Sequence, residues 1–415
     1  MKKTFLLILI MNTSWANSDN FMSLFNKALT KDPLIQQEKL SLLEIKHQIK
    51  KAKAEYYPKI KAIIGKEKRI APKERSIELQ KTVSELRLDY NLYQFGADQK
   101  KIQALEQKIH YKKQLIKYAQ DELKRKLEKA YLKAITHKKH LDLIKKELRY
   151  NQYMTKQVAK KEHQGLVGQS DAMEIQMRQA TFDNTLLKIT QDYQHALNQI
   201  RKLAFIPSHQ KVKLDDDISH RQLKVSKKEL LKASQLKNMN LSNLHSQILT
   251  SEHELNASFL KRMPTLKLKA RYGNMKIDDT YTTNNTQEGL VGFYLEIPLF
   301  DAGKKKAQED IKKIHHKKIQ LKLKKAEHNL EIDIIYNYEK LQNAHKLYEL
   351  AQINLANAQR YFKKVLAEYQ RGIKSSLDLV SARDRLYQFE LNLIKYNEDY
   401  QSLKIKLEQL SGLTF

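Results

Sequence analysis

The sequence predicts a mainly α-helical protein with a small β part, built from two tandem copies of one unit. Long polar runs with helical periodicity far exceed the length of an ordinary globular helix. Glycine and proline are scarce, at 10 and 6 of 415 residues, which favours extended helices. Landmark residues of the first half also return at a nearly constant distance in the second half.

The duplication is seen in five landmark pairs. Ala28 and Ala233 are 205 residues apart, Pro58 and Pro264 are 206 apart, and Gly96/Gly303, Gly165/Gly372 and Asp171/Asp378 are each 207 apart. Five such coincidences are not expected by chance. We therefore expect a first repeat over residues 17–206, a linker over 207–226 that holds Pro207 and an acidic run, and a second repeat over 227–415.

The N-terminus has the order of features found in an export signal. Lys2 and Lys3 precede the apolar run 5–11, and small residues flank Trp15 before the cleavage site expected after Ala16. An uncleaved amphipathic start is the alternative. The formal charge of +30 becomes +28 without the two lysines, so the mature chain stays basic. Because there is no cysteine, disulfides, thiolate metal sites, a cysteine nucleophile and a lipid-anchor cysteine are excluded.

The sequence of each repeat predicts a helix, two strands and a long helical hairpin. A helical run over 21–56 stops before Pro58, because proline disfavours helix in the residue that precedes it. Alternating residues at 60–65 and 86–92 predict strands on either side of a polar stretch, and a helix of about 100 Å follows over 97–163. The second repeat predicts a helix over 227–260, strands over 266–272 and 291–297, and helices from Asp301 to the tip and over 376–410.

The two helical hairpins are predicted to turn at short glycine-containing tips. Gly165 and Gly372 can take the left-handed backbone that ends a helix. Ser375 and Asp378, three residues apart, offer a hydroxyl and a carboxylate that cap the next helix. After residue 20, no apolar run approaches the ~20 residues of a membrane helix, so strands are the expected membrane-crossing elements.

Both the helices and the strands predict an oligomer. Apolar positions before the second tip alternate in steps of four and three, which is the seam of a coiled coil, from Ala344 to Tyr369. A single hairpin would leave much of each helix without a neighbour. Open edges of two amphipathic β-hairpins cannot face lipid, since unpaired backbone groups there cost several kcal/mol each, so closure requires several copies.

The joint Ile297-Pro298-Leu299-Phe300-Asp301-Ala302-Gly303, the two tips, Tyr57-Pro58 and the duplication together make the sequence resemble the TolC-like outer-membrane efflux proteins. The resemblance covers nearly the whole mature chain. It implies a homotrimer with a twelve-stranded outer-membrane β-barrel on a long periplasmic α-helical barrel. Such proteins are passive exit ducts without enzymatic activity or cofactor. A periplasmic adaptor protein connects them to an inner-membrane pump, in drug efflux or type I secretion.

The same resemblance implies roles for residues at the tips. Asp378 matches an aspartate of the entrance constriction, and Ser381 takes the place of the second aspartate, which puts a double acidic ring in doubt. Lysine at position 374 replaces an arginine and loses its bidentate fork, so a weaker closed-state latch is expected. The implied latch residues are Tyr369, Lys374, Asp171 and Ser170.

Basic residues of one strand predict a cationic barrel lumen. Lys267, Lys269 and Arg271 share the polar face of the strand over 266–272. The alternative is a generally lysine-rich chain whose lumen carries counter-charges such as Asp89 and Glu296. For Asp378 the simpler interpretation is helix capping alone, which is compatible with a position in the pore.

Other classes of function are less well supported. A polyanion binder would concentrate its basic residues in one patch, whereas here they are spread along the helices. A structural periplasmic coiled-coil protein without channel activity would not need the four strands. No phosphate loop, nucleophile motif or carboxylate pair predicts catalysis. The histidine pairs, which lack a surrounding ligand set, predict no metal site: His137 with His140, and His315 with His316.

Overall fold

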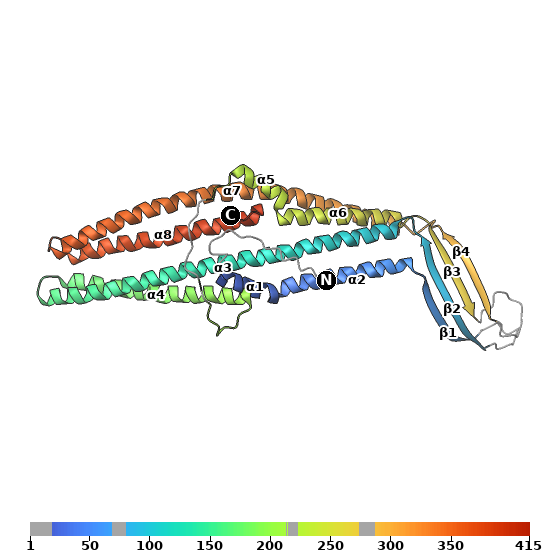
Figure 1. The fold of residues 1–415 in the computed structure, drawn as a ribbon, viewed down its shortest axis with the longest axis horizontal. Coiled ribbons are helices and arrows are strands. Elements are labelled where there is room, and N and C mark those ends of the chain that lie inside the picture. The colour runs from blue at the N-terminus through green and yellow to red at the C-terminus, as the bar shows by residue number, and fades with distance from the viewer. Residues whose placement is uncertain (1–18, 69–79, 213, 215–222, 274–286) are drawn as a thin grey trace. The chain divides into compact units, whose positions relative to one another are not determined.

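The computed structural model describes residues 19–68, 80–212, 214, 223–273 and 287–415 (Figure 1). The predicted signal, most of the two connections between paired strands and the centre of the predicted linker lie outside the described residues. Within them, two helices, two strands, a 67-residue helix and a 36-residue helix follow one another twice. The helices are α1 (Asp19–Lys31), α2 (Pro33–Lys53), α3 (Ala97–His163), α4 (Gln169–Ala204), α5 (Lys227–Lys237), α6 (Met239–Leu260), α7 (Lys304–Gln370) and α8 (Ser376–Ser411). The strands are β1 (Lys59–Lys68), β2 (Gln80–Tyr93), β3 (Thr265–Gly273) and β4 (Glu288–Glu296), and the short 3₁₀ helix η1 is Ala54–Tyr56.

Contacts within the chain divide it into two units, and each unit draws on both halves of the sequence. The hairpin unit comprises residues 1–36, 117–240 and 326–415. The sheet unit comprises residues 37–116 and 241–325. We describe each unit by itself.

The first helix of each predicted repeat is interrupted, so the expected unbroken runs over 21–56 and 227–260 were wrong. Pro33 is the first residue of α2, where its missing N–H is not needed, and the Asp32 carboxylate accepts a hydrogen bond from the Ile35 N–H at 2.9 Å. Asn238 separates α5 from α6, and its side-chain amide donates to the Leu410 carbonyl at 2.8 Å. Asn238 also accepts a hydrogen bond from the Asn240 N–H at 2.9 Å, so both breaks have a local cap and the second one has a distant contact as well.

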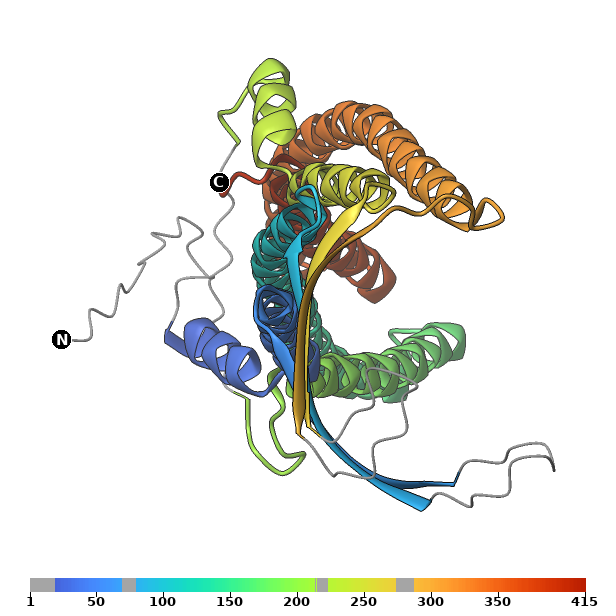
Figure 2. The same ribbon diagram turned by 90° about the vertical axis from the view of Figure 1, so that its right-hand side faces the viewer.

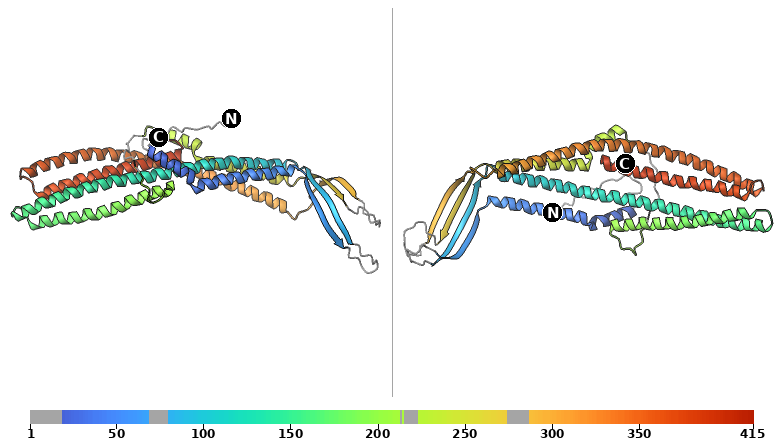
Figure 3. Two further views of the ribbon diagram at one scale, coloured as in Figure 1. Left: turned by 60° about the horizontal axis from the view of Figure 1, so that its bottom comes forward. Right: turned by 180° about the vertical axis from the view of Figure 1, so that it is seen from behind.

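In the hairpin unit, α3 and α4 form one helical hairpin and α7 and α8 form another, with the two tips at the same end (Figures 1 and 3). The predicted long helix over 97–163 is confirmed. A core of buried apolar side chains includes Phe21, Leu127, Tyr131 and Ile200, with the Phe21 and Tyr131 rings 5.6 Å apart edge to face. None of the described helices is long and apolar enough to cross a membrane.

The sheet unit holds one antiparallel sheet of order β1-β2-β3-β4, in which both predicted β-hairpins are confirmed. Pairing of β2 with β3 joins the two hairpins, with Arg87 opposite Arg271 and Leu88 opposite Ala270. Seen nearly edge-on in Figure 2, the four strands form a single curved layer. In the described chain, β1 and β4 are the edge strands, and their outer backbone groups have no partner strand.

Candidate functional site

The second tip joins α7 to α8 through a turn that the sequence correctly predicts. Gly372 has a left-handed backbone, with φ of 80°, and the Ile373 N–H donates back to the Glu368 carbonyl at 3.0 Å. Ser375 then starts α8 with a capping box, because its hydroxyl accepts from the Asp378 N–H at 3.1 Å while the Asp378 carboxylate accepts from the Ser375 N–H at 3.0 Å. The predicted capping role of Asp378 is confirmed.

These hydrogen bonds also determine the charge state of the tip. The backbone N–H and hydroxyl of Ser375 lower the pKa of the Asp378 carboxyl, and nearby Lys374 lowers it further. Asp378 is exposed and therefore carries a negative charge at neutral pH. Ser381, three residues further along α8, is exposed on the same side of the helix.

The first tip turns in a similar way but lacks the capping box. Gly165 has φ of 71°, and the Leu166 N–H donates to the Lys161 carbonyl at 2.9 Å. Gly168 precedes α4 and provides no side-chain cap. Ser170 is exposed and Asp171 is half-buried in the first turn of α4. The landmark spacing is thus shared by the two tips, whereas the chemistry of the cap is not.

The two tips share one apolar cluster, which brings the predicted latch residues into one region. The cluster contains Met154 and Val158 of α3, Ile175 of α4, Val365 of α7 and three residues of α8. Tyr369 packs against this cluster, and the ammonium group of Lys161 lies 4.2 Å from the centre of its ring. The structure therefore links Tyr369 to α3 through Lys161, while the latch with Ser170 and Asp171 stays a prediction.

A buried ion pair that sequence reasoning missed links α3 to α8 behind the tips. The Arg383 guanidinium binds both carboxylate oxygens of Glu147, with its Nε 3.0 Å from Oε2. Glu147 is fully buried. Burial raises the pKa of its carboxyl, which the hydrogen bonds from Arg383 oppose. The Arg383 guanidinium also lies 5.4 Å from the centres of the Tyr150 and Phe362 rings.

A second polar contact links α4 to α8. Arg178 donates from Nε to an Asp384 carboxylate oxygen at 2.9 Å and from Nη1 to the Asn151 side-chain oxygen at 3.2 Å. The signal available in the sequence was the position of Glu147 and Asn151, four residues apart, on the same side of α3 as the apolar residues Ile144 and Met154. Only the fold shows that Glu147 is bound by Arg383 of the other hairpin, whereas Asn151 is bound by Gln179 and Arg178 of its own hairpin.

The sheet has one charged face and one apolar face. Residues opposite each other on paired strands lie on the same face, so the register defines both faces. On the apolar face, Val291 and Phe293 are 71% and 72% exposed, and Ile60, Leu86 and Leu295 are also exposed. The alternation that predicted lipid-facing strands is thus present across all four strands.

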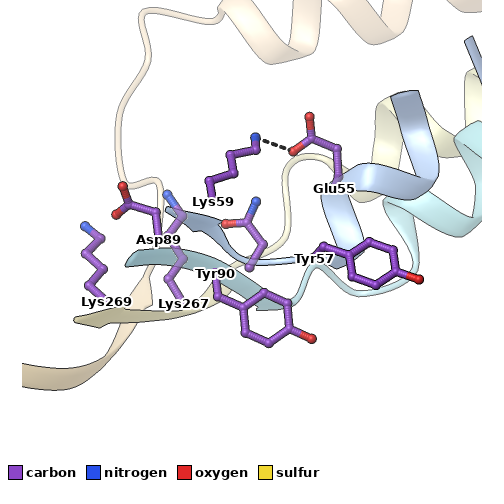
Figure 4. A pocket seen from close by; sticks show the side chains of 8 residues that line it. Glu55, Tyr57, Lys59, Asp89, Tyr90, Lys267 and Lys269 are labelled. Atoms are coloured by element: carbon purple, nitrogen blue, oxygen red, sulfur yellow. Dashed lines mark hydrogen bonds and ion pairs between the residues drawn. The ribbon is translucent and has the colours of Figure 1, made fainter. Parts of the chain in front are cut away.

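The register shows how the charges on the other face are arranged. Lys267 and Lys269 both bind the carboxylate of Glu296, with Lys269 Nζ 3.2 Å from it. At one end of this face a polar hollow is lined by residues that include Glu55, Lys59 and Asp89; Figure 4 shows the Lys59 ammonium directed at Glu55, 2.6 Å away. Two of the three predicted lumen cations are therefore neutralised in part.

Arg271 lies in a different environment on the same face. It is opposite Arg87, and Arg87 is opposite Lys61, so three cations form one row across β1, β2 and β3. Arg87 is paired with Glu85 of its own strand. Among the described residues, neither Lys61 nor Arg271 has a carboxylate within ion-pair distance. Like charges directly opposite each other are unfavourable, so this row has the least compensated positive charge on the sheet.

The histidine pairs lie in ordinary packing environments. His140 is 3.3 Å from the Tyr387 hydroxyl, and His316 is 2.8 Å from the Ser251 hydroxyl. Burial lowers the pKa of both His137 and His140. Over the described ranges, no group of three histidine or acidic side chains is close enough together to hold a metal ion.

Comparison with solved structures shows the same fold in bacterial outer-membrane channels. CusC has a TM-score of 0.81 at 18% identity, over 97% of this chain and 95% of CusC. The outer membrane protein VceC from Vibrio cholerae has a TM-score of 0.80 at 14% identity, over 95% of this chain and 98% of VceC. The CmeC outer membrane channel from Campylobacter jejuni has a TM-score of 0.79 at 12% identity, over 95% of this chain and 86% of CmeC.

Sequence comparison gives the family. A search of curated proteins found no match. The family model for outer membrane efflux proteins matches residues 24–204 and 226–413, which together are most of the chain. With this match, the paired helical hairpins and the four-stranded sheet, the chain belongs to the outer membrane efflux protein family.

Proposed function

We propose that this chain is one subunit of a homotrimeric exit duct in the outer membrane. Three copies contribute four strands each to a twelve-stranded β-barrel, and their hairpins form a helical barrel in the periplasm. The observation that carries the proposal is the sheet, in which one face is apolar and exposed, the other is charged, and both edges are open. Lipid on one face and water on the other, with edges closed by neighbouring copies, satisfies all three features.

The helices independently support association with other copies. In the hairpin unit, α7 buries Leu341, Ala351 and Val365 on one side. In the part of α7 from residue 326 onward, six further large apolar residues are exposed, and at 100° per residue they fall within about one third of the helix circumference. This exposed α7 stripe consists of Ile332, Tyr336, Leu347, Leu350, Ile353 and Tyr361. A second apolar stripe on an already packed helix is what an intersubunit contact requires.

The duct is proposed to be passive and to receive cargo through a periplasmic adaptor from an inner-membrane pump, in efflux or in type I secretion. Export by a signal cleaved after Ala16 brings the chain to the envelope. The match of the family model in two segments, 24–204 and 226–413, supports a duplicated chain with a linker near 207–226. No part of this route requires catalysis by the chain or a cofactor.

For the lumen, we propose an anion-favouring barrel and an acidic entrance. Asp378 and Ser381 line the entrance, and Asp378→Asn is expected to raise the anion share of the current. In the barrel, Glu296 offsets Lys267 and Lys269, so Arg271 with Lys61 and Arg87 carries most of the preference. Charge reversal at Arg271 should therefore shift the reversal potential toward cations more than charge reversal at Lys267 does.

Crosslinking and conductance together test the proposed function. The chain has no cysteine, so every disulfide of a variant must involve engineered positions. One cysteine is placed on each edge strand, in β1 near Ile60 and in β4 near Phe293. These cysteines form disulfides either between copies or within the engineered pair of one copy. A duct predicts oxidised trimers from β1-plus-β4 variants and discrete conductance steps in planar bilayers. A monomer without conductance would instead support a structural periplasmic coiled coil.

A further inference from the structure

The joint between β4 and α7 presents an apolar surface beyond the end of the sheet. The exposed residues Val291, Phe293 and Leu295 alternate along β4, and Ile297 and Leu299 continue the same alternation after the strand ends at Glu296. Leu299 is 92% exposed and Phe300 is 89% exposed, more than any other large apolar side chain in the described chain. The face proposed to contact lipid thus extends into the joint.

Hydrogen bonds hold this joint in a defined conformation. The Asp301 carboxylate accepts from the backbone N–H groups of Gly303 and Lys305, each at 3.1 Å. Ala302 and Gly303 both have left-handed backbone, with φ of 52° and 77°. These hydrogen bonds fix the turn at residues 301–305, which directly follows the exposed Leu299 and Phe300.

A surface hollow beside the joint combines an apolar wall with a cationic rim. Its apolar wall includes Phe259, Leu299 and Phe300, and its charged rim includes Arg262, Asp301, Lys305 and Lys306. Glu309 binds Arg262 at 2.9 Å and Lys306 at 3.3 Å, and Asp310 binds Lys306 at 3.2 Å. Among the described residues, Lys305 of the rim and Lys304 beside it have no carboxylate within ion-pair distance, so the uncompensated positive charge lies on these two lysines.

The first repeat has no such rim at the matching joint. The landmark offsets of 206 and 207 place Lys261, Arg262 and Lys304–Lys306 opposite a set of residues without a single cation. That set consists of Glu55, Tyr56, Ala97, Asp98 and Gln99. Tyr93, which matches Phe300, packs against Phe95 at a ring distance of 4.9 Å. The cations of the second joint therefore have no counterparts at the matching positions of the first joint, where the nearest lysines of α3 are Lys100 and Lys101.

We propose that the hollow at the second joint binds an anionic phospholipid of the periplasmic leaflet. The ammonium groups of Lys304 and Lys305, with Arg262 and Lys306, bind the phosphate-bearing headgroup, while Leu299 and Phe300 contact the acyl chains. Apolar residues followed by lysines suit the boundary between hydrocarbon and headgroups. This inference rests on the proposed function, because it places the sheet in the outer membrane.

Lipid retention by the full-length mature protein tests the site. The protein is purified in detergent, given equal amounts of phosphatidylglycerol and phosphatidylcholine, and analysed by native mass spectrometry. The expected wild-type result is preferential retention of phosphatidylglycerol. Lys304→Gln combined with Lys305→Gln should reduce that preference about thirtyfold, since each basic residue near an anionic surface contributes about 1 kcal/mol. Leu299→Ser should weaken retention of both lipids.

A matched control lies in the first repeat. Lys100→Gln combined with Lys101→Gln removes the same charge near the first joint and should leave the preference unchanged. An unchanged preference in the Lys304/Lys305 variant, or an equal loss in the control, would overturn the proposal. Dissociation of the oligomer by Leu299→Ser without any change in lipid retention would assign the hollow to a second copy instead. Conductance of wild-type protein in pure phosphatidylcholine bilayers tests the duct separately.

Discussion

The long helices α3 and α7 have equal length and occupy matching positions in the two repeats. They differ in the side chains on one face and in the contacts that those side chains make. At an offset of 207, Ile332 and Ile353 of α7 correspond to Arg125 and Lys146 of α3. Arg125 binds Glu408 and Lys146 binds Glu390 at 3.1 Å, both on α8, whereas the two isoleucines are exposed. The face that α3 turns to its own chain is, on α7, apolar and exposed in the described part of the chain. Helix α3 thus contacts α8 of its own chain through this face, whereas α7 leaves the same face exposed.

The largest expected effect comes from placing charge on the exposed α7 stripe. Ile332→Asp combined with Ile353→Asp should abolish the proposed trimer, because each isoleucine loses about 1.5–3 kcal/mol of burial at the proposed interface and each carboxylate would be desolvated there. Size-exclusion chromatography with light scattering measures the mass, and circular dichroism checks that helix content is kept. Ala356→Asp adds a charge to an exposed position outside the α7 stripe and is expected to remain trimeric.

Breaking the buried ion pair between α3 and α8 should have a large effect on stability. Arg383→Ala leaves Glu147 fully buried without its counter-charge, so the unfolding free energy should fall by about 3–5 kcal/mol. Lys146→Ala removes a more exposed ion pair and should cost about 1 kcal/mol or less. Denaturant unfolding followed by circular dichroism compares the two variants. Equal losses would show that the Arg383–Glu147 pair contributes no more than a surface contact.

Removing a serine hydroxyl should have a smaller effect, and it should destabilise the helix at the second tip but not the helix at the first. Ser375→Ala removes a capping box and should destabilise α8 by about 1 kcal/mol, which hydrogen exchange of the first-turn amides can detect. Ser170→Ala is the control at the first tip, where Gly168 takes the N-cap position without a side-chain cap, and should alter exchange in α4 little. Similar exchange in both variants would mean that the capping box does not distinguish the tips.

The stability of the chain is expected to change gradually with pH because of two histidines on α3. Burial lowers the pKa of His137 and His140 in the folded chain, and Asp192 opposes this shift while Lys133 adds to the shift at His137. The unfolded state therefore binds more protons below its own histidine pKa of about 6.5, and stability falls as the pH drops through that value. Melting temperatures between about pH 7.5 and 5.5 should decline less in His140→Gln. An identical decline would exclude His140 as a source.

Local patterns in the sequence determined most of the secondary structure. Uninterrupted helical periodicity predicted α3, alternating residues predicted both β-hairpins, and Gly372 with Ser375 and Asp378 predicted the second tip, because each depends on neighbours a few residues apart. The duplication offset was likewise visible without a fold. The break at Pro33 had a local signal in Asp32, which is a standard N-cap residue.

The remaining features were decided by contacts between distant segments. The pairing of β2 with β3, which creates the Lys61–Arg87–Arg271 row, joins residues about 180 positions apart, and no local pattern sets that register. The Arg383–Glu147 pair likewise joins residues more than 200 positions apart, whereas Asn238 combines a local contact with Asn240 and a distant one with Leu410, 172 residues away. Periodicity shows that a helix has an apolar side, but only packing shows which sides are covered. For that reason the outward stripe of α7 and the cationic hollow beside Phe300 became visible in the tertiary structure alone.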